Sequence, residues 1–510
     1  MKKSHQIFIL LIIYLLTLGI RIYWLSQKDA FMVDEGLSVT LVSYNNDYMW
    51  TSNYEFNKAY TGKEVKEISL CDSGSFKNVL KDIIRLWKYN RDPPHTNLYY
   101  SFLRLSLAGL KTGNIKPIIF RGGILNLLFF TISFVFFFLL MKLLFSDSKS
   151  LQFLTTACAF LSTATISNTL LLRPYQIQET LFIIFCYCFI ITFDQKKYVI
   201  NENRLYINTK LFFSLSLITA FTLLTGYYSI IFIAPFGLYV IYIRIRQKNY
   251  AEIIFYMLVL CVGLTFAQSF YLRYLRGYFS LAPREAMHTL FGNILGNLKA
   301  SISCAGTLLQ GHFFTYPVIA ICACCLVYIL FRKQKLRFNL SILCFIVSIF
   351  YLIIILVLAP YKILRYVMPV FPFFVIPLAV IINSIEKRKV SIVIMLLLFA
   401  AFFKNTLSQN NIDHLYPNKR SNYYFAQDTA IPVFVLNSSP WKYADMVPYF
   451  NDEQIYYFND RYENIKSMLR DHNEFYLVVE DELKISNPVQ FKIEQEFTVS
   501  YFICKKIKAI

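Results

Sequence analysis

Residues 338–359 read FNLSILCFIVSIFYLIIILVLA, an apolar run of 22 residues without a charged side chain. A helix rises about 1.5 Å per residue, so a helix of this length crosses the ~30 Å hydrocarbon core of a bilayer. The residues directly before the run include four cations: Arg332, Lys333, Lys335 and Arg337. The stretch therefore predicts a membrane-spanning helix with a basic loop at one end.

The composition of the whole 510-residue chain supports a membrane protein, because 56% of its residues are apolar and 16% are charged. Soluble domains have about 45–50% apolar and about 25% charged residues. This excludes a disordered chain and disfavours a soluble enzyme. The net charge of +20 would suggest nucleic acid in a soluble protein, but here Lys and Arg act as topological anchors. Most of the eleven cysteines fall within apolar runs, which indicates packing rather than disulfides.

Apolar runs of spanning length recur along the first four-fifths of the chain. We predict about eleven transmembrane helices, at residues 7–25, 117–141, 151–171, 179–193, 211–226, 228–243, 252–272, 313–331, 338–359, 366–383 and 391–403. With the N-terminus in the cytoplasm, five short cytoplasmic loops carry 16 basic residues, as the positive-inside rule requires. The odd number of spans then places the C-terminus outside.

The segments between and after the spans predict two domains. Residues 1–403 form the membrane domain, whose first external loop, 26–116, includes interfacial helices such as the amphipathic segment 96–110. Residues 404–510 form a small external α/β domain. Its strands are expected at 431–436, 454–458 and 474–479, with a terminal pair near 490–506 and helical stretches near 440–450 and 461–470.

Two adjacent carboxylates, Asp34 and Glu35, follow the first predicted helix by about nine residues. Carboxylates at a membrane surface are costly to hold there, and they serve as general bases or metal ligands. Taken alone, the pair is better explained as the solvated start of a loop. Its significance depends on what else gathers at the same face.

Other polar residues fall in loops on the predicted outer face. A guanidinium group binds phosphate oxygens through two parallel hydrogen bonds. Taken alone, each arginine could be an interface anchor, but their convergence from four loops favours a functional site. These candidates are Arg91, Asp92, His95, Arg121, Arg173, Tyr175, Glu179, Arg273, Arg276, Lys362, Arg365 and Tyr366.

Five segments, in order over about residues 1–385, resemble motifs of the GT-C glycosyltransferases. This superfamily uses polyprenyl-phosphate-linked sugars and includes the protein O-mannosyltransferases and the lipid A aminoarabinose transferases. Asp34-Glu35 resembles the acidic motif of the family, and Asp92-Pro93-Pro94 with Leu98-Tyr99-Tyr100 resembles its x-P-P-L-Y-Y segment. The similarity continues at Arg121 before a long apolar span, at the R-x-Y turn Arg173-Pro174-Tyr175, and at Arg365-Tyr366-Val367-Met368-Pro369.

The chain departs from the family pattern at two places. Asp92 stands before the prolines where many relatives have His or Lys, and three residues separate the prolines from Leu98. Some relatives carry an acid five residues after the arginine of the R-x-Y turn, where this chain has Gln178 followed by Glu179. The second acid of the site is therefore left open between Asp92 and Glu179.

The resemblance implies a GT-C fold and an inverting hexosyl or pentosyl transfer at the outer membrane face. Asp34, with Glu35 beside it, would deprotonate the acceptor hydroxyl. Arg273, Arg276, Lys362 and Arg365 would stabilise the departing polyprenyl phosphate. The acceptor would be a glycan, a lipid or a protein. A divalent metal is possible as cofactor, although no metal-binding pattern of His or Cys is present on the outer side.

Two other functional classes fit the same composition. A transporter or flippase of lipid-linked saccharides would place ionisable residues and Gly/Pro breaks within its spans. An O-antigen polymerase or ligase would have a dominant late outer loop, whereas the longest loop between spans in this chain comes first. The short loops and lysine-rich start are typical of a bacterial inner-membrane protein, with the N-terminus in the cytoplasm and the C-terminus in the periplasm. No nucleic-acid partner is expected.

Overall fold

The computed structural model describes residues 3–42, 54–70, 75–89, 96–110, 115–193, 199–201, 204–206, 209–248, 250–279, 281–332, 341–416, 428–436, 442, 444–461, 468, 472–480, 491–499 and 502–509. Contacts divide the chain into two compact units. Unit 1 consists of Met1–Trp24, Pro93–Tyr99 and Asn126–Asp413. Unit 2 consists of Leu25–Asp92, Tyr100–Leu125 and His414–Ile510.

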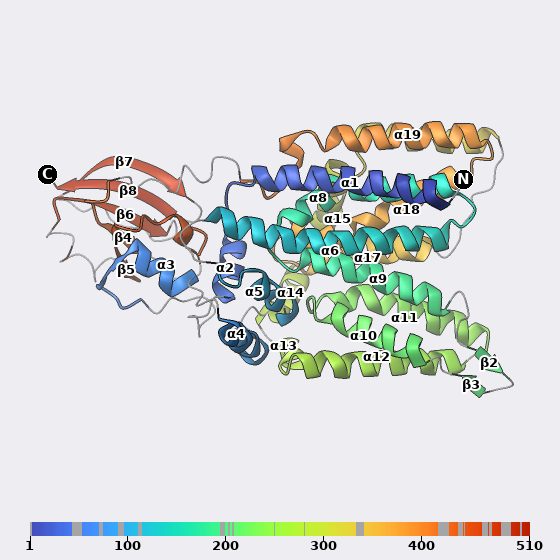
Figure 1. Cartoon of the computed structure of the whole chain (residues 1–510), viewed down its shortest axis with the longest axis horizontal. Helices are drawn as coiled ribbons and strands as arrows, with labels where there is room; N and C mark the ends of the chain where they lie inside the picture. Colours follow the sequence, from blue (N-terminus) through green and yellow to red (C-terminus); the bar gives the residue numbers. More distant parts are fainter. Residues whose placement is uncertain are drawn as a thin grey trace. The chain divides into compact units, whose positions relative to one another are not determined.

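Unit 1 is built almost entirely of helices, and its long helices lie side by side with roughly parallel axes (Figure 1). Three of the described helices, α1, α6 and α5 (Asn97–Ser106), have residues in both units. The helices are α1 Lys3–Gln27, α6 Ile115–Leu144, α7 Lys149–Phe160, α8 Thr163–Leu170, α9 Tyr175–Phe193, α10 Thr209–Leu223, α11 Ser229–Arg246, α12 Tyr250–Phe270, α13 Tyr274–Gly277, α14 Leu281–Gly292, α15 Ile294–His312, α16 Tyr316–Phe331, α17 Ser341–Leu358, α18 Val375–Asn383 and α19 Arg388–Asn405. Short 3-10 helices are η1 Leu364–Tyr366, η2 Met368–Phe374 and η3 Gln409–Asn411.

Every predicted apolar run coincides with helix. The run at 151–171 comprises α7 and α8, and the run at 366–383 comprises η1, η2 and α18. Within the described ranges, six single helices are long and apolar enough to cross a membrane: α1, α6, α9, α11, α12 and α17. The bent pair α15–α16 passes the same test as one broken span. The chain is thus a polytopic α-helical membrane protein, as the sequence predicts.

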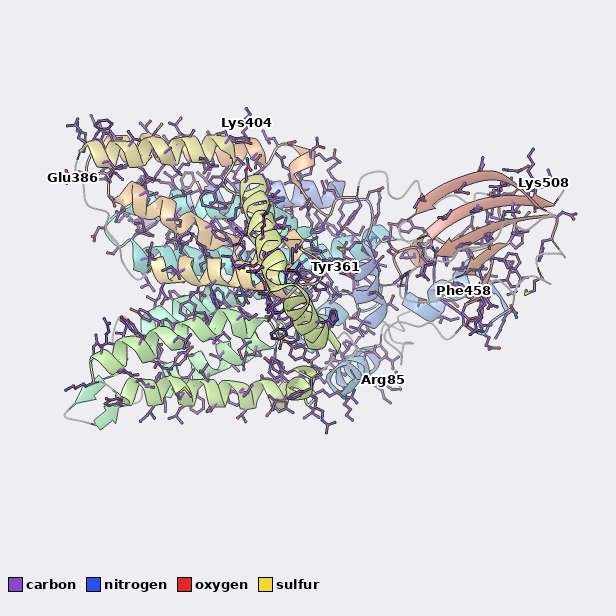
Figure 2. All side chains as sticks on the ribbon, turned by 180° about the vertical axis from the view of Figure 1, so that it is seen from behind. Arg85, Tyr361, Glu386, Lys404, Phe458 and Lys508 are labelled. Atoms are coloured by element: carbon purple, nitrogen blue, oxygen red, sulfur yellow. The ribbon has the colours of Figure 1, made fainter. Side chains whose placement is uncertain are left out.

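The stretch 273–312, predicted as a loop, is instead helical, because it contains α13, α14 and α15. Asn293 caps α15 by accepting a 2.9 Å hydrogen bond from the backbone N–H of Gly296. Ser301 and Ala305 are buried on one side of α15, and large apolar side chains lie exposed on other sides. This dispersed apolar pattern hid the helix in the sequence. Helix α15 meets α16 at 94°, and Figure 2 shows α15 lying across the neighbouring helices of unit 1.

Aromatic rings fill much of the interior of unit 1. Phe182 of α9 and Phe232 of α11 stack with ring centroids 3.9 Å apart. Phe160 of α7 lies edge-on to Phe130 of α6 with centroids 5.4 Å apart. Such ring pairs add to the stabilisation that buried area gives. The abundance of Phe in the sequence is therefore used for packing between helices as well as for contact with lipid.

Unit 2 contains one mixed sheet, which has six strands among the described residues, in the order β1-β5-β4-β6-β8-β7. Strands β5, β4 and β6 run parallel, and β8 and β7 continue the sheet in antiparallel register. The strands are β1 Ala59–Thr61, β4 Val433–Leu436, β5 Ile455–Asn459, β6 Glu474–Glu480, β7 Phe491–Val499 and β8 Phe502–Ala509. The predicted strands of the tail are all confirmed.

The helices of unit 2 come mainly from the first loop. They are α2 Val33–Leu41, α3 Gly62–Leu70, α4 Phe76–Tyr89, α5 Asn97–Ser106, shared with unit 1, and the 3-10 turn η5 Val447–Tyr449. The predicted helical stretch near 440–450 corresponds in part to η5. The stretch near 461–470 lies outside the described residues except at positions 461 and 468. A small hairpin of unit 1, β2 Val199–Asn201 with β3 Arg204–Tyr206, was not predicted.

Strand β1 joins the first loop to the sheet of the tail. It pairs antiparallel with β5, with Tyr60 opposite Tyr456. Tyr54 stacks on Phe458 with ring centroids 4.1 Å apart. Farther along the sheet, Phe434, Phe475 and neighbouring apolar side chains form a buried cluster. The sheet is therefore assembled from two segments far apart in the chain, whereas the sequence predicted it from the tail alone.

Replacing Gly62 by alanine should loosen this junction between loop and tail. A Cβ atom at Gly62 would lie 1.9 Å from the backbone oxygen of Asn451, which cannot move as a flexible side chain can. Overpacking of this kind costs about 1–3 kcal/mol. We expect Gly62→Ala to speed hydrogen exchange in β1 and β5 of the purified protein. The control is Gly306→Ala in α15, where nothing lies within 4 Å of the added methyl. Unchanged exchange in Gly62→Ala would contradict the tight contact.

Candidate functional site

The acidic pair Asp34-Glu35 lies in the first turn of α2. The carboxylate of Glu35 accepts a 3.0 Å hydrogen bond from the backbone N–H of Met32, the residue that precedes the helix. A carboxylate in the first turn satisfies a backbone donor and interacts favourably with the helix dipole. These local effects explain why the helix begins at this point in the sequence.

Glu35 also forms a buried ion pair with Lys28, and both side chains are 0% exposed. The ammonium of Lys28 lies 5.8 Å from the ring centroid of Tyr416. A buried carboxylate is tolerated when an opposite charge and hydrogen bonds compensate its loss of water. Glu35 is therefore enclosed and compensated inside unit 2. Lys28 was not among the candidates predicted from the sequence, because no sequence pattern marks a lysine of a loop as the partner of Glu35.

Asp34 is in a different environment from Glu35. Its side chain is partly exposed, while its backbone oxygen accepts a 2.9 Å hydrogen bond from the hydroxyl of Ser38 one turn later. Two adjacent carboxylates thus have distinct surroundings, one enclosed and one accessible. An accessible carboxylate on a rigid helix start is suited to exchange a proton with a bound hydroxyl.

The tail of the chain packs directly against α2. Val33 and Leu37 form a buried cluster with Ala444. A Cβ atom at Gly36 would lie 2.6 Å from the backbone oxygen of Ala444, so only glycine permits this approach. The following residue, Asp445, is fully buried. The tail therefore forms one wall around the acidic motif, a contact that no pattern in the sequence could indicate.

The segment just before α2 is held by the tail as well. The backbone N–H of Asp29 donates a 2.9 Å hydrogen bond to the oxygen of Leu415. The hydroxyl of Tyr449 donates to the backbone oxygen of Asp29 at 3.4 Å. These bonds fix the chain between the end of α1 and the start of α2.

In unit 1, two of the predicted motifs come together. Arg365 donates a 3.1 Å hydrogen bond to the hydroxyl of Tyr366, and its guanidinium carbon lies 5.0 Å from the centroid of that ring. The ring of Tyr366 is edge-on to Tyr175, with centroids 6.1 Å apart. Arg173 is buried in the turn just before α9. The R-x-Y turn and the Arg365-Tyr366 segment, distant in sequence, thus form one cluster.

Lys362 is engaged inside unit 1. Its ammonium donates to the side-chain oxygen of Asn297 in α15 and, at 2.8 Å, to the backbone oxygen of Leu356 in the last turn of α17. Desolvation lowers the pKa of Lys362 from its ordinary value, and the electrostatic interaction with Cys304 opposes this shift in part. Lys362 therefore connects α15 to the end of α17. These two hydrogen bonds leave fewer of its N–H donors for a ligand.

Arg273 and Arg276 flank Tyr274 at α13, and both side chains are exposed. The hydroxyls of Tyr274 and Tyr278 lie 2.8 Å apart. Tyr227, from the turn between α10 and α11, stacks on Tyr274 with centroids 5.5 Å apart. A group of tyrosines thus supports the short helix that carries the two arginines.

The start of α5 is anchored close to the ends of α10 and α12. The hydroxyl of Thr96 donates to the backbone oxygen of Leu224, and the amide of Asn97 donates to the oxygen of Phe270 at 3.3 Å. The three candidates directly before this anchor, Arg91, Asp92 and His95, lie outside the described residues.

Glu179 is fully buried in the interior of unit 1. Its carboxylate accepts hydrogen bonds of 3.0 Å from the amides of Asn168 and Gln176. The hydroxyl of Thr169 donates to the oxygen of Gln176 at 3.2 Å. Glu179 is thus part of a hydrogen-bonded network between α8 and α9.

The same network contains Arg21, an arginine of α1 that the sequence analysis did not select. Arg21 donates to the hydroxyls of Thr169 and Thr165 at 3.1 and 3.2 Å. Its guanidinium carbon lies 3.9 Å from the centroid of Phe130. The available signal was a single cation in the otherwise apolar run 7–25.

Arg121 fastens the turn between α5 and α6. Its guanidinium donates a 2.7 Å hydrogen bond to the backbone oxygen of Ala108, and its own backbone oxygen accepts a 2.8 Å bond from the hydroxyl of Ser106. These two hydrogen bonds give Arg121 a structural role that does not require a bound ligand. Among the described residues, no group of three or more His, Cys, Asp or Glu side chains is arranged to hold a metal ion.

Comparison with models of known protein families gave no match, and comparison with curated protein sequences gave none. Solved structures with a similar fold include two of ArnT from Cupriavidus metallidurans. The crystal structure bound to undecaprenyl phosphate is 8% identical, with a TM-score of 0.55. The apo crystal structure is 9% identical, with a TM-score of 0.56. In both comparisons 97% of each chain is covered. This likeness shows that the chain shares the fold of ArnT over 97% of its length.

Removing Lys28 should destabilise unit 2 strongly, because Glu35 would remain buried without its counter-charge. Breaking a buried pair in this way costs about 3–5 kcal/mol. We expect Lys28→Met to lower the thermal unfolding temperature, and Lys28→Met with Glu35→Gln to recover most of the loss. The control is Lys58→Met, at the Lys58–Glu55 pair whose side chains are 52% and 72% exposed. Such exposed pairs contribute about 0–1 kcal/mol. Equal effects of Lys28→Met and Lys58→Met would refute the buried pair.

Proposed function

We propose that the chain is a membrane glycosyltransferase that moves a sugar from a polyprenyl phosphate to a hydroxyl group of a glycan, lipid or protein acceptor. The observation that carries the proposal is the acidic motif at the start of α2. There Glu35 is buried and compensated by Lys28, while Asp34 stays accessible. The shared fold with ArnT, one structure of which is bound to undecaprenyl phosphate, supports the choice of donor.

In the proposed reaction, Asp34 takes the proton of the acceptor hydroxyl as its oxygen attacks the anomeric carbon. The bond between that carbon and the phosphate oxygen breaks, and its electron pair leaves with the polyprenyl phosphate. Attack opposite the leaving group inverts the anomeric configuration. General-base assistance of this kind contributes about 10²–10⁴-fold to a rate.

Glu35 acts in this proposal as a positioning residue. Its carboxylate is held by Lys28 and by the backbone of Met32, so it has little freedom to meet an acceptor. It fixes the first turn of α2 and thereby the direction of Asp34. The packing of Ala444 on Gly36 supports the same turn from the other side.

Arg365 is the best-placed candidate to bind the donor phosphate. It is half-buried, lies against Tyr366, and belongs to the cluster that includes Tyr175. A guanidinium placed this way can meet phosphate oxygens as negative charge develops on the leaving group. Arg273 and Arg276 are exposed candidates for an outer contact, whereas Lys362 is engaged by Asn297 and Leu356.

For the second acid, the hydrogen bonds of Glu179 favour a positioning role. Glu179 contacts Asn168 and Gln176 and so organises the turn that carries Arg173 and Tyr175. Asp92 remains the candidate for a second acid that reaches the substrate. We further propose that the reaction takes place on the periplasmic face of a bacterial inner membrane, on the basis of the basic loops at the opposite side.

One observation favours the alternative of a transporter for lipid-linked saccharides. Arg21 and Glu179 are ionisable side chains buried within spanning helices, which is typical of translocation pathways. Their hydrogen bonds to Thr165, Thr169 and Asn168 argue for a fixed structural network instead. Transfer of sugar by purified protein, with donor and acceptor both accessible, distinguishes the two functions because a transporter would catalyse none.

Asp34→Asn should lower sugar transfer by at least about 10²-fold, because the amide keeps the shape of the side chain but accepts no proton. The measurement is transfer by purified protein in lipid, with bound donor determined in parallel. Donor binding and the unfolding temperature should stay unchanged. The control is Asp460→Asn, just after β5 in unit 2, which should keep normal turnover. Near-normal transfer by Asp34→Asn would overturn the proposed base.

Arg365→Lys should weaken donor binding, and Arg365→Ala should weaken it more. Lysine keeps the charge but loses the planar pair of donors that matches phosphate oxygens. The control is Arg246→Lys, since Arg246 also lies against a tyrosine ring, 4.5 Å from the centroid of Tyr242. Binding of polyprenyl phosphate to the purified variants provides the measurement. Equal affinity in all variants would leave Arg365 as an anchor for Tyr366.

A further inference from the structure

Helix α4 has an apolar stripe that no other described part of the protein covers. Its inner side is buried at Val79, Asp82 and Leu86. Its outer side exposes Phe76, Leu80, Ile84 and Trp87, at 73%, 43%, 51% and 38%. These positions follow the spacing i, i+4, i+8 and i+11, which places them along one line of the helix surface.

Basic residues accompany this stripe. Lys77, Lys81 and Lys88 are exposed, and Arg85, labelled in Figure 2, is half-buried on the same helix. The acidic residue of α4, Asp82, is buried and forms a 2.8 Å ion pair with Arg104 of α5. The outer side of α4 is therefore apolar and positively charged.

Helix α5 extends the apolar surface and holds α4 in place. Phe102 and Leu105 of α5 are exposed large apolar side chains. The indole N–H of Trp87 donates a 3.0 Å hydrogen bond to the hydroxyl of Ser101. Together with the Asp82–Arg104 pair, this bond makes the two helices a fixed surface rather than a loose loop.

We propose that the outer side of α4 binds the surface of an anionic bilayer. A helix with an apolar stripe and flanking lysines lies in the membrane interface, where its rings enter the acyl boundary and its ammonium groups meet lipid phosphates. The fourteen residues of α4 span about 21 Å along the helix axis, which is too short to cross a bilayer. The helix also carries three exposed lysines and one half-buried arginine, which disfavour a transmembrane position. The lysines favour a negatively charged partner, and the apolar stripe beside them favours a partner with an apolar interior. An anionic bilayer has both properties, whereas an acidic protein surface without an apolar face has only the first.

The proposal adds α4 to the segment 96–110, which the sequence pattern predicts to lie in the interface. In α5 the side chains of Tyr99, Tyr100, Leu103 and Arg104 are buried, whereas Phe102 and Leu105 are exposed. The proposal concerns lipid contact by unit 2 and holds whether or not the chain transfers a sugar.

Lipid contact can be measured in the full-length protein reconstituted into lipid nanodiscs. Lipids brominated along their acyl chains quench the fluorescence of a tryptophan that reaches the acyl boundary. We expect bromolipid quenching to be larger in the native protein than in Trp87→Phe, which keeps the other three tryptophans of the chain. This difference should increase several-fold when phosphatidylglycerol replaces zwitterionic lipid. Equal quenching in the native protein and in Trp87→Phe would overturn the proposal.

Charge reversal tests the part played by the lysines. The triple variant Lys77→Glu, Lys81→Glu and Lys88→Glu should lose the dependence of quenching on anionic lipid. A control of equal net charge is Lys63→Glu, Lys492→Glu and Lys508→Glu, all at exposed positions of the same unit, which should behave as the native protein does. Equal responses of both triple variants would contradict headgroup binding.

Two further measurements keep the outcome decisive. Hydrogen exchange in α5 should be the same in all variants, which would show that the Asp82–Arg104 ion pair is intact. If exchange in the triple Lys→Glu variant differs, a triple Lys→Gln variant at positions 77, 81 and 88 takes its place. Shielding of Trp87 from aqueous acrylamide without bromolipid quenching would indicate a protein partner on α4 and would refute the lipid surface. Sugar transfer is not part of either readout, so failure here is distinct from failure of the proposed function.

Discussion

The buried contact of Lys28 with Glu35 is the interaction around which the acidic motif is organised. A carboxylate with no exposed surface needs a nearby cation and hydrogen bonds, and Glu35 has both, from Lys28 and from the backbone of Met32. Because this charge is compensated internally, α2 can begin a few residues after the end of α1. The accessible carboxylate is then Asp34. Gly36, in the same first turn of α2, lets the tail approach close enough for Ala444 to complete the wall.

The sequence predicted those features of the fold that depend on local pattern. The spanning helices and the strands of the tail follow from long apolar runs and from dense β-branched and aromatic residues. Strand β1 could not be predicted, because three residues carry no periodicity and their stability comes from pairing with β5 far along the chain. The helices of 273–312 were missed for another reason: the buried side of α15 consists of small residues such as Ser301 and Ala305.

For the candidate site, residue type and position in the sequence selected Asp34-Glu35 and Arg365 as candidates but did not show their surroundings. The sequence could not show that Glu35 is enclosed by Lys28 or that Lys362 is engaged by Asn297. Nor could it separate an acid that meets a ligand from one that organises the interior. The carboxylate of Glu179 accepts hydrogen bonds from Asn168 and Gln176, and this contact was not visible in the sequence. Such distinctions depend on side chains brought together from different helices.

The buried acids of the first loop and the lysines of α4 have different surroundings. Glu35 and Asp82 are buried and each is compensated by a cation, Lys28 and Arg104 respectively. The lysines of α4 are exposed beside an apolar stripe. The sheet joins the tail to the first loop through β1, so α2 and α4 belong to one folded unit. In the proposed reaction, binding of α4 to lipid headgroups would keep the folded unit that carries Asp34 at the membrane surface, where the phosphate of a polyprenyl-phosphate donor lies.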